Sequence, residues 1–264
     1  MKLLFFLLPL SWSFAFGQVK IDTIKSWKTD AKGFAIDNLE NVYLYNKNKL
    51  EKYNSNYQLF ATYSNNKNGE IHQIDVTNPF KIHVWYKNQN AIEILDNTLS
   101  PEQNKVLDLT QANLYNTSAF AYSSIDNGIW FYDIELFQLI KINTSLERYY
   151  ESGNLLQLLN IDSLEVTQMI EKNKKVYLIT NNVIYVFDIY GAFYTKIHFP
   201  HQGELSINNE IIYAYTPQQI IAYNTVTFES ETIKFSTKKG DKLKIKNGFL
   251  YLLSDNQFTV FSFL

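Results

Sequence analysis

The chain has 264 residues, of which 46% are hydrophobic and 16% aromatic, and its formal net charge at pH 7 is −2. This composition excludes a disordered polar chain, and the near-balance of 24 basic and 26 acidic residues argues against a partner such as nucleic acid or an anionic membrane surface. No cysteine is present, so the sequence offers neither a disulfide framework nor an acceptor for N-terminal lipidation.

Residues 1–17 are predicted to be a signal peptide that is removed. Lys2 precedes an apolar run, Leu3–Leu10, and small residues follow up to Gly17. Serines interrupt the apolar stretch well before the length of about 20 residues that a membrane-spanning helix needs. We therefore expect residues 18–264 to form a single exported domain in the periplasm of a Gram-negative bacterium, with full secretion as the alternative.

A strand–turn–strand pattern then recurs six times along the chain. The first strands of the copies are centred on Val42, Ile82, Ile129, Val176, Ile211 and Phe249, and successive copies are 35 to 47 residues apart. A period of about 40 residues with several short strands in each copy is typical of a β-propeller. We therefore predict an all-β fold, a six-bladed β-propeller, with a seven-bladed ring and a double β-sandwich as alternatives.

Each copy has room for four strands. The innermost strands are expected at 32–37, 71–76, 118–123, 165–170, 204–208 and 242–246, and an outer strand at 57–63. The last copy ends without an outer strand, and the alternating segment 19–27 is suited to supply it. An N-terminal strand that completes the last blade would close the ring and remove an open sheet edge. Helical spacing is confined to 154–166, where one or two turns are expected.

The stretch "FAIDNLENVYL" at 34–44 resembles the start of blades in NHL-like six-bladed propellers. A cysteine-free exported propeller of this size and composition also resembles the small periplasmic propellers of outer-membrane secretion machinery, among which is the plug subunit of the type nine secretion translocon. The resemblance implies a protein partner in the bacterial envelope, an outer-membrane channel or translocon, and a plugging role on its periplasmic side.

Catalytic and metal sites are not indicated by any motif. His198 and His201 flank Pro200, which breaks the helical geometry that would let them share a metal, and His83 is expected to be a hydrogen-bonded core residue. Calcium-dependent lactonases on six-bladed propellers carry acidic residues on the axis, where Asp37, Asp75 and Glu165 are the candidates here; turn chemistry is their more ordinary role. We expect no enzyme activity, no cofactor, no bound nucleic acid and no membrane insertion.

Protein binding is the predicted mode of action, because propeller faces present loops on a rigid scaffold. Loops at 99–117 and 151–165 and the turn 133–138 are expected on one face. The interface candidates are Leu136, Phe137, Leu155 and Leu156 on this face, and Tyr190 and Phe193 in the turn 188–194 on the opposite face. These side chains either form an exposed patch or pack under their own loops. The alternative is a glycan- or peptide-binding propeller; it would need an exposed Trp at an axial pocket, whereas Trp85 and Trp130 lie in expected strands.

Overall fold

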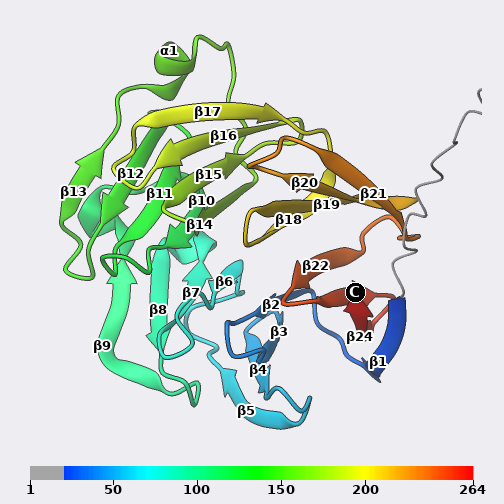
Figure 1. Ribbon diagram of the computed structural model, residues 1–264. Coiled ribbons are helices and arrows are strands. Elements are labelled where there is room, and N and C mark those ends of the chain that lie inside the picture. The colour runs from blue at the N-terminus through cyan, green and yellow to red at the C-terminus, as the bar shows by residue number, and fades with distance from the viewer. Residues whose placement is uncertain (1–20, 264) are drawn as a thin grey trace, which may run out of the picture.

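The computed structural model describes residues 21–263, with the side chains of all of these except 103–105. Its strands form six four-stranded antiparallel sheets arranged around a common axis, which confirms the predicted six-bladed propeller (Figure 1). The predicted signal peptide, residues 1–17, lies outside the described residues. Within residues 21–263, no helix has the length and apolar character needed to cross a membrane.

Each blade runs from an inner strand at the axis to an outer strand at the rim. Blade 1 contains β2 (Gly33–Ile36), β3 (Val42–Asn46), β4 (Lys49–Tyr53) and β5 (Leu59–Ser64), and blade 2 contains β6 (Gln73–Asp75), β7 (Ile82–Tyr86), β8 (Ala91–Leu95) and β9 (Pro101–Asp108). Blade 3 contains β10 (Thr117–Tyr122), β11 (Ile129–Asp133), β12 (Gln138–Ile142) and β13 (Arg148–Glu151). Blade 4 contains β14 (Gln168–Lys172), β15 (Lys175–Ile179), β16 (Val183–Asp188) and β17 (Phe193–His198). Blade 5 contains β18 (Gln202–Asn208), β19 (Ile211–Thr216), β20 (Gln219–Asn224) and β21 (Ser230–Lys234).

Blade 6 joins the two ends of the described chain. It contains β22 (Lys242–Lys246), β23 (Phe249–Ser254) and β24 (Gln257–Phe263), and its outer strand is β1 (Ile21–Lys28). β1 pairs antiparallel with β24 from Ile21 opposite Phe263 to Lys28 opposite Gln257. The predicted closure of the ring by an N-terminal strand is therefore confirmed, and β24 has a hydrogen-bonded neighbour on both sides.

The hydrophobic core lies between the blades. Six clusters of buried side chains occur, one at each junction of neighbouring blades. The middle strands supply most of these residues because both of their faces are covered, so they consist of near-continuous β-branched and aromatic runs. Trp85 on β7 and Trp130 on β11 are fully buried, in the strands where the sequence places them.

Two expectations from the sequence require correction. The segment 99–117 is not one long loop, because 101–108 forms the outer strand β9, followed by a 3-10 helix, η2 (Leu109–Ala112). The inner strand expected at 165–170 lies at 168–172 instead, so Glu165 falls in the preceding loop and is exposed. The short helical segment expected within 154–166 is confirmed as α1 (Leu155–Leu159), which ends at Asn160 in the left-handed conformation (φ 51°).

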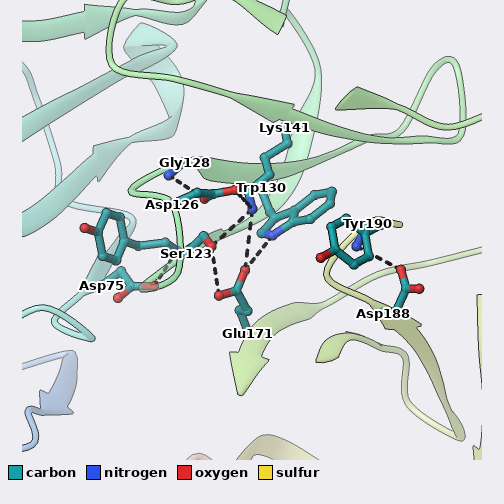
Figure 2. Close-up of polar contacts among 10 residues, drawn as sticks. Asp75, Ser123, Asp126, Gly128, Trp130, Lys141, Glu171, Asp188 and Tyr190 are labelled. Carbon is teal, nitrogen blue, oxygen red and sulfur yellow. Dashed lines mark hydrogen bonds and ion pairs between the residues drawn. The ribbon is translucent and has the colours of Figure 1, made fainter. Parts of the chain in front are cut away.

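A buried polar network joins blades 3 and 4 (Figure 2). Glu171 accepts hydrogen bonds from the Trp130 indole (2.7 Å) and from Ser123 (2.9 Å). Lys141 Nζ lies 2.7 Å from Asp126 Oδ2 and 3.9 Å from Glu171 Oε2, and it sits over the Trp130 ring at 4.6 Å from the centroid. Lys141 and Glu171 are almost fully buried. Lys141 is the cation that compensates the Glu171 charge, whereas the Lys141 charge is compensated by Asp126 and Glu171 together.

Candidate protein-interaction surface

The succession of antiparallel strands assigns every turn to one of two faces. The turns between the second and third strands and the loops that lead to the next blade share one face, here named the connecting face. The turns between the first and second strands and between the third and fourth strands share the opposite face. The sequence predicts this division correctly, because it follows from four-stranded blades alone.

Exposed apolar side chains on the connecting face gather over blade 3. Tyr115, Ile134, Leu136 and Leu158 are 55%, 43%, 50% and 55% exposed, and we call these four residues the blade-3 surface. Within the described chain they are the only exposed large hydrophobic residues in the turns and loops of the connecting face. Singly exposed apolar residues are ordinary, whereas a group on adjoining loops is typical of a binding surface.

Asp133 shapes the turn that carries Ile134 and Leu136. Its Oδ1 accepts hydrogen bonds from the backbone N–H groups of Glu135 (2.9 Å) and Leu136 (3.0 Å), and Phe137 completes the turn in the left-handed conformation (φ 53°). The turn is also tied to the neighbouring loop, because the Ile134 N–H donates to the Asn116 carbonyl at 2.9 Å. Tyr115 is thereby held next to the turn.

Helix α1 is fixed to the same turn. Asn154 caps the helix by accepting hydrogen bonds from the N–H groups of Leu156 (3.0 Å) and Gln157 (3.2 Å). Its amide also donates to the Leu136 carbonyl at 3.2 Å, and the Leu155 N–H donates to the Phe137 carbonyl at 2.8 Å. The three segments that carry the blade-3 surface are therefore joined by hydrogen bonds, and α1 projects beyond the sheets at the edge of blade 3 (Figure 1).

Of the four interface candidates that the sequence places on this face, one is exposed and three are fully or partly buried. Leu136 is exposed, whereas Leu155 is fully buried and Phe137 and Leu156 are half-buried against the core between blades 3 and 4. These three side chains therefore pack under their own loops and hold the surface in place. Sequence reasoning missed Tyr115, Ile134 and Leu158. Helical spacing of three residues would place Leu158 on the same side as the buried Leu155, so it gave no signal that Leu158 is exposed.

Tyr190 and Phe193 lie on the opposite face, as the sequence predicts. Tyr190 is 77% exposed at the tip of the turn between β16 and β17, and Phe193 is 40% exposed with its ring 5.7 Å from that of Phe187. Asp188 accepts the Tyr190 N–H at 2.8 Å (Figure 2), and Gly191 follows with a φ of 81°. Tyr190 and Phe193 are separated from the blade-3 surface by the height of the propeller.

Two of the acidic candidates for an axial metal, Asp37 and Asp75, accept hydrogen bonds from backbone N–H groups of turns. Asp37 is buried, and its carboxylate accepts the N–H groups of Leu39 (2.8 Å) and Asn41 (2.9 Å). Asp75 accepts the N–H groups of Thr77 (2.8 Å) and Tyr122 (2.9 Å). These contacts agree with the predicted turn chemistry, and the exposed Glu165 lies away from the inner strands.

The histidines are dispersed. His83 is buried in β7 with its ring stacked on Tyr122 at a centroid distance of 4.5 Å, and no described side chain hydrogen-bonds its ring nitrogens, in contrast to the expectation. His201 contacts the carbonyl of Phe199 at 2.8 Å, and His198 is exposed at the end of β17. Among the described residues, no group of three or more His, Asp and Glu side chains is placed to hold a metal ion.

Comparisons with known proteins establish the fold only. No protein-family model and no curated protein sequence matches the chain. Among solved structures, a streptogramin B lyase is 10% identical, with a TM-score of 0.62 and coverage of 93% of this chain and 97% of that one. The WD40 domain of Neurospora crassa Pan2 is 9% identical, with a TM-score of 0.60 and coverage of 92% and 95%. BamB from Moraxella catarrhalis is 11% identical, with a TM-score of 0.55 and coverage of 92% and 100%.

Proposed function

We propose that the protein is a non-enzymatic propeller that docks on a protein partner through the blade-3 surface. The observation that carries the proposal is the confinement of exposed apolar side chains on the connecting face to one blade and the loop that leads into it. Burial of such a group in a complex removes apolar area from water at about 25 cal/mol per Å². The surface thus has a driving force for association that the rest of this face lacks.

The composition of the surface favours a protein as the partner. Its apolar centre is bordered by polar groups, among them Glu135, Asn154 and Gln157, which matches the apolar core and polar rim of protein interfaces. The hydrogen bonds that join the three loops reduce the conformational entropy lost on binding. Recognition therefore requires no folding of the surface itself.

The partner is proposed to be an outer-membrane assembly, with the propeller plugging the periplasmic side of a protein-secretion translocon. Support for this comes from the signal-peptide pattern of residues 1–17, from the absence of cysteine, and from the resemblance to periplasmic propellers of secretion machinery. Such a role is steric and uses no cofactor.

Charge substitution on the blade-3 surface tests the docking proposal. We expect the double variant Leu136→Asp, Leu158→Asp to lose its partner in affinity purification from gently solubilised cell envelopes, with recovery reduced about tenfold or more, because two exposed apolar anchors become charged. Both sites are exposed, so the unfolding temperature is expected to stay close to that of the unchanged protein.

The control is Tyr190→Asp, which introduces one negative charge, half of that in the double variant, at an exposed aromatic residue on the opposite face. It is expected to retain the partner. Recovery of the unchanged protein as a lone monomer under gentle conditions would contradict the docking proposal, and loss of the partner by the Tyr190 variant alone would assign docking to the other face.

A further inference from the structure

The axis of the propeller contains a cavity of about 180 Å³. It is lined by residues of the inner strands β2, β6, β14, β18 and β22, which surround the centre of the ring (Figure 1). This volume is sufficient for a small polar group of a few heavy atoms together with ordered water. The cavity is distinct from the blade-3 surface, and nothing in the docking proposal uses it.

Three of the five charged side chains that line the cavity are lysines. Lys172 and Lys246 line it from the ends of β14 and β22, and Lys244 from the middle of β22. Lys244 is paired with Glu204 at 2.8 Å, which leaves Lys172 and Lys246. The Lys246 ammonium donates to the main-chain carbonyl of Ile36 at 2.9 Å. Lys172 is paired with Lys175 through its backbone, and its ammonium group forms no hydrogen bond or ion pair with another described residue.

The two acidic side chains in the lining, Asp75 and Glu171, already accept hydrogen bonds from protein groups. Both carboxylate oxygens of Asp75 accept backbone N–H groups, and Glu171 is held by Ser123 and Trp130 in the network between blades 3 and 4. Among the described residues, the ammonium groups of Lys172 and Lys246 therefore have a single hydrogen-bond acceptor between them, a neutral carbonyl. An ammonium group offers several N–H donors, so most of these donors have no acceptor among the described residues.

The electrostatics at Lys246 agree with this arrangement. The pKa of Lys246 is lowered to about 8, first by burial and then by the positive charges of Lys172 and Lys244, while Asp37 and Asp75 partly oppose the shift. A negative ligand between the two lysines would relieve their repulsion and favour the charged form of Lys246.

We propose that the channel binds an oxyanion, a carboxylate or phosphate group, between Lys172 and Lys246. Both lysines stand at the ends of inner strands, so the site opens toward the face opposite the docking surface. Charge-assisted hydrogen bonds from two ammonium groups are suited to such a group. The group belongs either to a free small anion or to the C-terminal carboxylate of a peptide that enters the channel.

Titration calorimetry of the purified chain at pH 7 tests the site, with inorganic phosphate, acetate and a short peptide bearing a free or an amidated C-terminus as probes. We expect saturable binding of at least one oxyanion probe and about tenfold weaker binding by Lys172→Gln, which removes one of the two ammonium groups of the site. Lys174→Gln removes an exposed lysine from the adjoining turn and should bind as the unchanged protein does. Preference for the free over the amidated peptide would identify a peptide terminus as the source.

The pH dependence provides a second measurement. Because Lys246 loses its proton near pH 8, acetate affinity is expected to fall between pH 7 and pH 9, and this fall should be absent in Lys246→Gln. The proposal is overturned if no oxyanion probe binds the unchanged protein at millimolar concentration, or if Lys172→Gln and Lys174→Gln bind equally. Either result would leave the docking proposal unaffected, since its test measures partner recovery through the other face.

Discussion

His83 couples the stability of the protein to pH. Its side chain is 1% exposed on β7, and burial lowers its pKa to about 4, an effect that the nearby Asp75 partly opposes. In the unfolded chain a histidine has a pKa of about 6.5, so the unfolded state binds a proton between pH 6.5 and 4 that the folded state does not. The free energy of unfolding therefore decreases as the pH falls through this range.

Between pH 7 and pH 4.5, His83 is expected to lower the free energy of unfolding of the unchanged protein by about 2 to 3 kcal/mol. His83→Phe keeps a ring against Tyr122 and should not show this part of the decrease. Urea denaturation of both proteins at the two pH values measures the difference. If the unchanged protein and the variant lose stability in parallel, the histidine is protonated in the folded state and the argument from burial fails.

Single residues show where sequence reasoning is informative and where it is not. The roles of Asp37 and Asp75 in turns are predictable, because an Asp at a strand end bonds its own backbone a few residues away. The surroundings of Lys172 are not, since they depend on side chains from four other blades that meet only at the axis. The hydrogen bonds of an Asp in a turn can be predicted from the neighbouring residues of the sequence, whereas an axial site is formed by residues from distant segments.

At the scale of the elements, the network between β11, β12 and β14 holds blades 3 and 4 together. We expect Lys141→Met to destabilise the protein by about 3 to 5 kcal/mol, because it leaves the buried Glu171 charge without its compensating partner. Burial already raises the pKa of Glu171, which indicates that the buried environment disfavours the charged form of its carboxyl group. Denaturant titration at pH 7 measures the loss.

The double variant Lys141→Met, Glu171→Gln provides the control. The oxygen of a neutral amide can still accept from the Trp130 indole, and its NH2 group can donate to the Ser123 hydroxyl, so the double variant should recover a substantial part of the stability lost in the single variant. If the two substitutions are instead additive, Lys141 and Glu171 are not energetically coupled, and the junction depends on apolar packing alone.

Element boundaries were least predictable where strands bury little. β9 has the polar sequence "PEQNKVLD" and lies at the rim, where one edge is free, so its residues need no apolar alternation. The blade-3 surface was missed in part for a related reason. Helical spacing would place Leu155 and Leu158 on one side of α1, yet Leu155 is buried and Leu158 is 55% exposed, because α1 is one short helix tied at its start to the turn at 136–137.

At the scale of the whole molecule, the ring was predictable because it is repetitive. Six copies of one pattern, with a strand missing from the last copy and a spare strand at the start, admit few arrangements, and the pairing of β1 with β24 is the one that gives every blade four strands. Side-chain packing stabilises the closure in addition to strand pairing. Trp27 on β1 contacts Phe258 in blade 6 and Tyr53 and Tyr57 in blade 1, with ring centroids 5.0 to 6.1 Å apart.

Removal of β1 is therefore expected to weaken the entire ring. A chain that begins at Thr29 leaves the edge of β24 unpaired, and we expect a lower unfolding temperature and concentration-dependent association through that edge, measured by calorimetry and light scattering. A chain that begins at Ile21 keeps the strand and is the reference. Trp27→Ala separates packing from pairing: it should cost about 2 to 4 kcal/mol without causing association, because the strand still covers β24. A shortened chain that stays monomeric and unfolds at the reference temperature would show that β1 does not contribute to closure.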